Sequence, residues 1–416
     1  MGRTVVVGAG MIGLLAAYEL TRRGERVIAF DRGHPGAGCS AGNAGWIVPS
    51  FSGPLPGPGL VAGSLRSMLN PASPLYVRLR PDLGLARWLR GFWGHCNPRD
   101  YETGYEALAM LNRETMASFD ALAGEGVEFE MHRTGLLHVF LSGKARDHHL
   151  EDLARAQRHG YAPPRELSGT EVREMEPGLS PAVAGGLFLE GERHVRPETL
   201  AAGVARRLAG SAAQIQPDVE VTGVVRRARE VRAVATRDGE VPADRVLLAA
   251  GAWSGILADR LGFSLPLLPG KGYSVTVSSP ALRLGCAVHL SEARVACSPF
   301  QDALRVAGTV EITNVTADVA RTRVAALRNA ASQYLKDWTR GASEVEWMGM
   351  RPFLPDGLPA IGRAPGFDNL YVATGHGMLG ITLAPVTGAV IADLMVRGRT
   401  GLDLTPFDPG RFARPR

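Results

Sequence analysis

Residues 4–31 decide the fold class, and they run Thr-Val-Val-Val-Gly-Ala-Gly-Met-Ile-Gly-Leu-Leu-Ala-Ala-Tyr-Glu-Leu-Thr-Arg-Arg-Gly-Glu-Arg-Val-Ile-Ala-Phe-Asp. The β-branched run over 4–7 predicts a buried strand, the Ala- and Leu-rich stretch up to Arg23 predicts a helix, and 26–30 predicts a second strand. Two strands joined by a helix within about thirty residues lie parallel in one sheet. The sequence therefore predicts an α/β unit of the Rossmann type.

The turn between the first strand and the helix carries the pattern Gly8-x-Gly10-x-x-Gly13. Glycines at these positions let a pyrophosphate approach the backbone at the helix N-terminus, where N–H groups lack partners. Asp31 follows Gly13 by eighteen residues, where a carboxylate accepts hydrogen bonds from an adenosine ribose. A chance glycine turn is the alternative, but strand, turn, helix, second strand and acid together favour dinucleotide binding. They leave open which dinucleotide it is.

Two further glycine-rich stretches and one arginine are candidates for a binding site. Residues 40–45 (Ser-Ala-Gly-Asn-Ala-Gly) are small enough to press their backbone against a flat ring, unless they form a flexible surface loop. Residues 375–380 (Gly-His-Gly-Met-Leu-Gly) precede a predicted helix over 383–396, whose N-terminus would favour an anionic reduced flavin. An ordinary glycine turn is equally compatible with that stretch. Arg351 lies between glycine and proline turns and is a candidate for bidentate carboxylate binding. The alternative is an ordinary arginine on the protein surface.

The sequence of the middle part of the chain indicates helices and antiparallel strands inserted between the α/β segments at the two ends. Residues 49–59 are rich in Pro and Gly and predict a loop. The helical stretch that follows has one apolar face over Leu108–Leu122. Residues 271–312 alternate between apolar and polar side chains, which predicts antiparallel strands, and a helix is expected over 318–338.

Composition and charge exclude several classes of protein. The 416 residues are 45% hydrophobic and 21% charged, which are globular proportions. The net charge of +5 comes from 46 basic residues mixed with 41 acidic ones, so no nucleic-acid footprint is expected. The four cysteines show no C-x-x-C spacing, and no metal is predicted. Since neither a secretory leader nor an apolar run near ~18 residues stands out, an integral membrane protein is not expected.

The sequence resembles the FAD-dependent amino-acid and amine oxidoreductases of the D-amino-acid oxidase and glycine oxidase type, and within them the bacterial D-amino-acid dehydrogenases. The matching stretches span most of the chain in the family's order and spacing. They are VVVGAGMIGLLAAYEL, SAGNAGWIVPS, LPLLPGKGYSVTV, LRVAGTVEI, MGMRPFLPDGLPAIG and LYVATGHGMLGITLAPVTG.

The resemblance implies an α/β fold, α+β overall, in which an antiparallel-sheet substrate domain with helices is inserted into a Rossmann-like FAD domain. The FAD domain would be discontinuous over 1–50, 195–260 and 345–416, and the substrate domain would take 51–194 and 261–344.

It also implies roles for individual residues around a non-covalent FAD. Arg351 would bind the substrate carboxylate, and Tyr273 would come from the strand that lines the substrate cavity. The implied cofactor-binding residues are Gly8, Gly10, Met11, Ile12, Gly13, Asp31, Arg32, Ser40, Asn43, Ala44, Gly45, Val221, Ala250, Gly251, Gly377, Met378, Leu379 and Gly380.

The implied reaction is oxidative deamination of a small amino acid, most simply a D-amino acid, by hydride transfer from Cα to the flavin. Oxidation of a cyclic or N-alkyl amino acid (hydroxyproline- or sarcosine-like) or of a 2-hydroxy acid is the alternative on this scaffold.

Arg196 departs from the family, which commonly has an N-capping Asp before Pro197. Met378 stands where glycine-oxidase-like members carry Arg, which argues against glycine as the substrate. An NAD(P)-dependent oxidoreductase would use the first βαβ unit equally well, but would leave the C-terminal glycine loop without a role; a non-enzymatic binding protein is a more distant alternative.

Electron acceptor and location follow less directly from the sequence. Oxygen or a quinone would reoxidise the flavin. Segment 62–100 interleaves arginines with Trp88, Phe92 and Trp93, a composition that suits a peripheral membrane surface or a partner subunit. An arginine-rich helical face that covers the core is the alternative. We therefore expect a cytoplasmic protein, either free or peripheral to the inner face of the cell membrane.

Overall fold

The computed structural model describes residues 2–58, 70–78 and 81–413. Its first sheet has six strands in the order β10-β2-β1-β14-β21-β20. All neighbours are parallel except β20 and β21, which confirms the parallel sheet predicted from residues 4–31. The strands are β1 (Arg3–Val7), β2 (Arg26–Phe30), β10 (Ala213–Gln216), β14 (Arg245–Leu248), β20 (Ala360–Arg363) and β21 (Leu370–Thr374).

Two helices that pack against each other carry most of one face of this sheet, α1 (Met11–Arg22) and α11 (Gly380–Arg397). They approach closely because Gly388 has no side chain, and a Cβ there would lie 2.8 Å from the Leu15 backbone. By length and apolar composition α11 resembles a membrane span, but it is mostly buried inside the protein as a core helix. Helix α8 (Pro197–Ala209) joins the same core, and α9 (Ser254–Leu261) packs on the opposite side.

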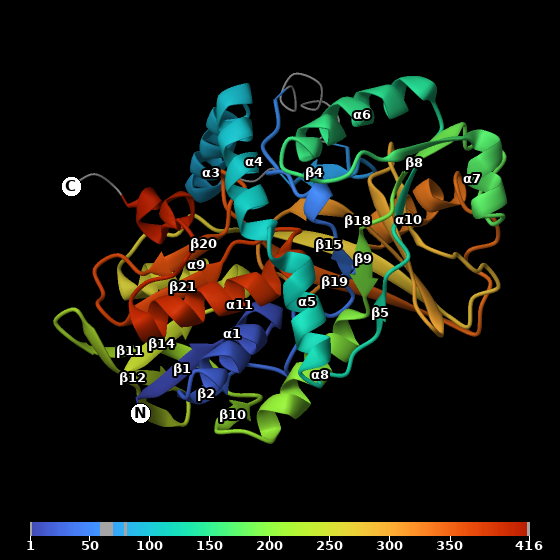
Figure 1. Cartoon of the computed structure of the whole chain (residues 1–416). Helices are drawn as coiled ribbons and strands as arrows, with labels where there is room; N and C mark the ends of the chain where they lie inside the picture. Colours follow the sequence, from blue (N-terminus) through green and yellow to red (C-terminus); the bar gives the residue numbers. More distant parts are fainter. Residues whose placement is uncertain (1, 59–69, 79–80, 414–416) are drawn as a thin grey trace.

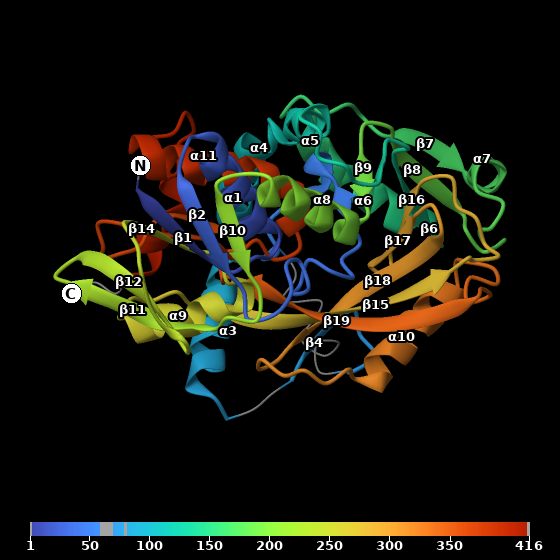
Figure 2. The same ribbon diagram turned by 90° about the horizontal axis from the view of Figure 1, so that it is seen from below.

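The second sheet has nine strands and lies at the other side of the molecule (Figures 1 and 2). It is antiparallel except for the pairs β16–β6 and β18–β4, and β19, which spans the predicted domain boundary at residue 345, forms its edge. The division into two domains stays a prediction. The strands are β4 (Leu75–Val77), β6 (Leu136–Phe140), β7 (Arg165–Ser168), β8 (Gly185–Leu189), β15 (Leu268–Ser278), β16 (Ala287–Leu290), β17 (Val295–Pro299), β18 (Ala303–Ile312) and β19 (Ser343–Phe353).

Smaller sheets and helices complete the fold. One three-stranded sheet has the order β11-β12-β13 and the other β3-β9-β5. These strands are β11 (Val221–Arg227), β12 (Glu230–Thr236), β13 (Gly239–Pro242), β3 (Trp46–Ile47), β9 (Arg193–Val195) and β5 (Met131–His132). In the described parts of the chain the remaining α-helices are α3 (Leu83–His95), α4 (Pro98–Asn112), α5 (Thr115–Gly124), α6 (Gly143–Gln157), α7 (Gly169–Met175) and α10 (Arg321–Ser332), and 3-10 turns include η1 (Pro49–Phe51) and η3 (Gly251–Trp253).

Two predicted helices differ from those observed. The helical face over 108–122 is divided between α4 and α5, because buried Asn112 ends α4 and its side chain accepts a hydrogen bond from Thr115 at the start of α5. The helix expected over 318–338 is shorter, since residues 334–336 leave α10 and bond to the backbone of residues 178–180. The first break follows from a local side-chain hydrogen bond and the second from long-range backbone hydrogen bonds, and helical periodicity registers neither.

Candidate cofactor and substrate site

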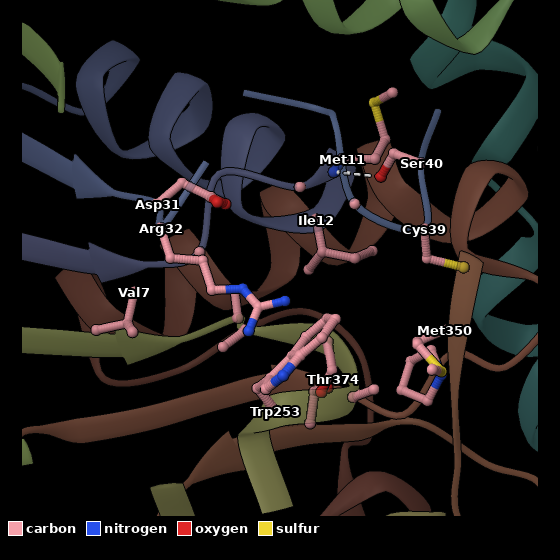
Figure 3. Close-up of a pocket in the computed structure, with 18 of the residues that line it drawn as sticks. Val7, Met11, Ile12, Asp31, Arg32, Cys39, Ser40, Trp253, Met350 and Thr374 are labelled. Carbon is pink, nitrogen blue, oxygen red and sulfur yellow. Dashed lines mark hydrogen bonds between the residues drawn. The ribbon is translucent and has the colours of Figure 1, made fainter. Parts of the chain in front are cut away.

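A cavity of about 610 Å³ opens beyond the carboxyl ends of the parallel strands β1, β2, β14 and β21. Open α/β sheets bind ligands at this edge, because the strand-to-helix turns converge there. In Figure 3, Asp31 and Arg32 stand at one end of the cavity, and Cys39 and Met350 stand at the other. The elongated arrangement suits a ligand with two chemically different ends.

Most of the residues predicted to hold a cofactor line this one cavity, although they come from six separate segments. Those outside its lining are Gly13, Ala44, Gly45, Met378 and Leu379; Gly13 lies in a helix–strand contact, and the Met378 side chain is half exposed. The lining residues among those predicted are Gly8, Gly10, Met11, Ile12, Asp31, Arg32, Ser40, Asn43, Val221, Ala250, Gly251, Gly377 and Gly380.

The first glycine turn is shaped by contacts that only glycine permits. Gly8 has a φ of 103°, and a Cβ there would lie 2.5 Å from the carbonyl oxygen of Ala249. A Cβ on Gly13 would lie 1.9 Å from the carbonyl oxygen of Gly8. Since both obstacles are backbone atoms, neither can move aside without moving a strand. The pattern of glycines therefore sets the distance between β1, β14 and the first turn of α1.

Two helices present their N-termini to the cavity, and at α1 the Met11 N–H is already bonded to Ser40 Oγ. Neither Gly10, before α1, nor Leu379, before α11, makes a side-chain capping hydrogen bond. The first intrahelical bonds are Leu14 N–H to Gly10 and Leu383 N–H to Leu379, so the preceding N–H groups of each helix have no helical acceptor. Helix dipoles place partial positive charge at these ends. The cavity thus offers two sites for negative charge, as the pyrophosphate and the reduced ring of a flavin dinucleotide require.

The end of the cavity beside β2 carries the groups expected for an adenosine. The Asp31 carboxylate accepts hydrogen bonds from Ala9 N–H at 2.7 Å and Gly33 N–H at 3.0 Å, which hold it across the glycine turn. Arg32 stacks on the indole of Trp253, with 3.7 Å between Cζ and the ring centroid. Figure 3 shows this pair facing the Asp31 end of the cavity. Together with the glycine turn and the helix termini, these groups fit FAD.

The segment 40–45 is held between the two sheets. Ser40 Oγ accepts a hydrogen bond from Met11 N–H at 2.9 Å, which attaches the segment to the start of α1. On its other side, the carbonyl of Asn43 accepts a bond from Arg305 at 2.9 Å, and that of Ala44 accepts one from Ser298 at 2.7 Å. The segment is therefore no loose surface loop, although of its predicted residues only Ser40 and Asn43 line the cavity.

Arg351 lies next to the cavity on β19, between two lining residues, Met350 and Pro352. Its guanidinium covers Gly272 of the paired strand, where a Cβ would lie 2.2 Å from Cζ. It donates to the carbonyl of Thr309 at 2.8 Å, and no carboxylate of the described residues forms an ion pair with it. Burial raises the pKa of Cys39, a lining residue, and the nearby charge of Arg351 offsets part of that rise. A largely buried cation without a counter-ion therefore stands at the Cys39 end.

Tyr273 is a correction to the predicted site. The side chain is fully buried, packs with Val324 and Leu327 of α10, and donates from its hydroxyl to Glu311 at 2.7 Å. Burial and this hydrogen bond raise the Tyr273 pKa above its usual value. Because neighbouring residues of a strand point to opposite faces, Tyr273 faces α10 while Gly272 faces Arg351. The catalytic role predicted for Tyr273 rested on its strand lining the substrate cavity, and the side chain points toward α10 and not toward Arg351.

Several lining residues were missed in the sequence. His376 is buried, and its Nε2 lies 3.0 Å from Thr387 Oγ1; burial lowers its pKa to about 3, so the imidazole is neutral. Burial raises the Cys39 pKa to about 11, so its thiol keeps its proton. Cys39 and Trp253 adjoin predicted residues, and that adjacency was the available signal. The expected loss of a side-chain cap at Arg196 is confirmed, since its guanidinium pairs with Asp302 instead.

Comparisons with known proteins agree with this geometry. The sequence model of the DAO family, described as FAD dependent oxidoreductase, matches residues 3–394. A D-amino acid dehydrogenase of Chromohalobacter salexigens is 30% identical over 99% of this chain and 100% of its own length. A D-amino-acid oxidase of Bradyrhizobium diazoefficiens is 32% identical, with 99% of each chain covered. Among solved structures, glycine oxidase from Geobacillus kaustophilus superposes with a TM-score of 0.76 at 28% identity, covering 100% of both chains.

Proposed function

The chain belongs to the family of FAD-dependent oxidoreductases, and from this premise we propose that it oxidises a small amino acid, most simply a D-amino acid. The product would be an imino acid, which water hydrolyses to a 2-oxo acid and ammonia. The names of the relatives that match its whole length support this substrate class. The single observation that carries the proposal is the uncompensated guanidinium of Arg351 beside the cavity.

Arg351 supplies what a carboxylate substrate needs. A buried cation is costly unless an anion pairs with it, and burial lowers the pKa of this guanidinium. A carboxylate would satisfy the charge through two parallel hydrogen bonds, which also fix the orientation of the substrate. Because the Arg351 charge acts on the Cys39 thiol, a carboxylate bound to Arg351 would place the substrate Cα near the Cys39 end of the cavity.

The chemistry divides between cofactor and protein. FAD, when bound, supplies the acceptor for a hydride from the substrate Cα. The chain binds and orients: Arg351 holds the carboxylate, and the N-terminus of α11 contributes positive potential near Gly380. Neutral His376 is engaged with Thr387, so we assign it no proton transfer and expect the substrate amine to enter unprotonated.

Anaerobic reduction of the flavin by a panel of compounds tests the proposal. A D-amino acid should bleach the oxidised flavin faster than its L-enantiomer, an N-alkyl or cyclic amino acid, or the 2-hydroxy acid of the same side chain. Faster bleaching by an N-alkyl amino acid or a 2-hydroxy acid would identify that compound class as the substrate in place of a D-amino acid. Bleaching by none of them would contradict amino-acid oxidation.

We propose that FAD is held without a covalent bond. Cys39 is the one cysteine among the described residues that lines the cavity, and its protonated thiol is a poor nucleophile. Denaturing precipitation should therefore leave all of the flavin in the supernatant. Yellow colour that stays with the precipitated protein would contradict this.

The electron acceptor and the location belong to the same proposal. We propose that oxygen or a quinone reoxidises the flavin and that a cytoplasmic enzyme contacts the membrane or a partner subunit through 62–100. The described part of this segment includes α3, whose Trp88 and Phe92 face the core, while Leu83, Arg87, Arg90 and Trp93 are exposed; Arg66 and Arg80 lie outside the described residues. Exposed arginines beside apolar side chains suit an anionic lipid surface. Exposure of the reduced enzyme to air distinguishes the two acceptors, because rapid reoxidation of the flavin would indicate oxygen and slow reoxidation would favour a quinone. Failure of the protein to bind anionic liposomes at low salt would contradict the proposed membrane contact.

A further inference from the structure

Three histidines from three separate elements meet inside the molecule, apart from the residues that line the cavity. His138 of β6 and His289 of β16 are directly paired in register, and His149 projects from α6. His138 Nδ1 lies 3.0 Å from His289 Nδ1 and 3.0 Å from His149 Nε2. One nitrogen from each ring lies within 4.8 Å of the other two. The three nitrogens therefore cluster around His138 Nδ1, and the remaining separation, between His149 and His289, is at most 4.8 Å.

The environment keeps these rings uncharged and mostly dry. His138 and His289 are buried, and the ring of Phe51 covers all three, with centroids 4.8 Å from His138, 5.3 Å from His149 and 5.4 Å from His289. Burial lowers the pKa of His149 to about 4 and that of His289 to about 3, and that of His138 well below its usual value. Neutral imidazole is the form that binds metal ions.

Hydrogen bonding among the rings leaves the cluster incomplete. If His138 Nδ1 accepts from both neighbours, its Nε2 must carry the proton; if Nδ1 carries the proton, it cannot serve both neighbours well. In either case His138 Nε2 is buried and has no partner among the described residues. A cation at the centre would be bound by all three converging lone pairs and would remove the competition between them.

We propose that His138, His149 and His289 form a binding site for a late first-row divalent cation, for which Zn²⁺ is the probe. Bonds of about 2.05 Å to tetrahedral zinc place ligand nitrogens roughly 3.3 Å apart, close to the two separations of 3.0 Å. Imidazole ligands without a carboxylate suit Zn²⁺, Ni²⁺ or Cu²⁺ and not Ca²⁺ or Mg²⁺. The absence of a metal predicted from the sequence rested on cysteine spacing, which cannot detect histidines brought together from 138, 149 and 289.

The site would act on the fold through the elements it joins. A bound ion fixes α6 to the paired strands β6 and β16. The ring of Trp46 lies 5.7 Å from that of His289, and its Nε1 donates at 3.0 Å to Ser298, which in turn donates to the carbonyl of Ala44. The ion would therefore stabilise the contacts through Trp46 and Ser298 that hold segment 40–45 in place. We expect a mainly structural ion, because it does not touch the main cavity.

Metal titration of the FAD-loaded full chain, prepared without a histidine tag and freed of metal by a chelator, tests the site. The wild type should bind one equivalent of Zn²⁺, and its Tm should rise on addition of the ion. His149→Ala should weaken Zn²⁺ binding by at least ~100-fold and abolish the rise in Tm. His148→Ala is the matched control, since His148 is the neighbouring residue on α6 with its side chain 78% exposed, and it should behave like the wild type.

Co²⁺ provides a second measurement that does not depend on a variant. Binding to the metal-free wild type should produce ligand-field bands at longer wavelength than the flavin absorption, and Zn²⁺ should displace them. The proposal is overturned if the wild type takes up no Zn²⁺ and shows no such bands, or if His148→Ala and His149→Ala lose binding equally. If His149→Ala does not fold, the presence or absence of the Co²⁺ bands in the wild type decides.

Discussion

The two sides of the cavity are built in different ways. On the side of the six-stranded sheet, Gly8 and Gly13 place backbone against backbone, and an added Cβ would meet carbonyl oxygens. On the side of the nine-stranded sheet, Gly272 leaves room for the mobile end of a side chain, the guanidinium of Arg351. The first side is thus rigid and shaped by main chain, whereas the second is adjustable and shaped by side chains. A family can therefore retain one cofactor while its substrate varies.

The largest expected effect is that of Gly13→Ala, on the rigid side. Its Cβ would lie 1.9 Å from the Gly8 carbonyl oxygen, so α1 must move away from β1. Overpacking against backbone should cost more than about 3 kcal/mol of unfolding free energy and remove FAD from the purified protein. Flavin content by absorbance and denaturant unfolding measure both losses.

A second helical glycine provides the control for this change. Gly94 lies in α3, and a Cβ there would meet nothing within 4 Å. Gly94→Ala should keep full FAD content and lose no stability, because alanine is the better helix former. A Gly13→Ala protein that retains stoichiometric FAD and wild-type stability would show that the close contact between residue 13 and the Gly8 carbonyl is not needed for FAD binding.

Arg351→Ala should have the next largest effect, on catalysis and not on the fold. Loss of the guanidinium removes both affinity for the carboxylate and the orientation of Cα, so kcat/KM for the best amino acid should fall by about 30- to 1000-fold. FAD content and Tm should stay near wild type, because among the described residues the Arg351 side chain makes one hydrogen bond, to Thr309. Arg351→Lys should recover part of the activity, since it keeps the charge but loses the planar fork. Equal activity of wild type and Arg351→Ala would place the carboxylate elsewhere.

The same contrast explains how much could be predicted from the sequence. Gly8, Gly10 and Asp31 belong to one local unit of strand, turn and helix, so their spacing indicated their position around the cavity. Tyr273 was assigned through the resemblance, which implied only that its strand lines the substrate cavity. Strand alternation tells which residues share a face, but not which face meets the cavity. Arg32 on Trp253, like the cluster around His138, joins segments far apart in the chain, and no local pattern marks such contacts.

Gly272→Ala tests the adjustable side more gently. The added methyl would lie 2.2 Å from Arg351 Cζ, and the flexible side chain can move aside without moving a strand. We expect unchanged FAD content and stability and a loss in kcat/KM of roughly tenfold, about 1.4 kcal/mol, since the guanidinium is displaced but not removed. Gly223→Ala, in β11, is the control, because a Cβ there would meet nothing within 4 Å. A Gly272→Ala enzyme that loses FAD would show this side to be as rigid as the first.

The smallest effect is expected from His376→Gln, which replaces a titratable group at the cofactor side while keeping a polar group able to reach Thr387. Burial holds the pKa of His376 at about 3 in the folded protein, below its usual value of 6.5. The unfolded chain therefore takes up a proton as the pH falls below 6.5 while the folded chain does not, so this histidine destabilises the wild type progressively toward acid pH. Between pH 6.5 and 5.5 the variant should gain about 1 kcal/mol of unfolding free energy over the wild type, with kcat/KM at pH 8 within about threefold. Denaturant unfolding at the two pH values measures the gain. A stability difference that does not change with pH would contradict the lowered pKa of His376. A large loss of activity at pH 8 would show that His376 takes part in the reaction.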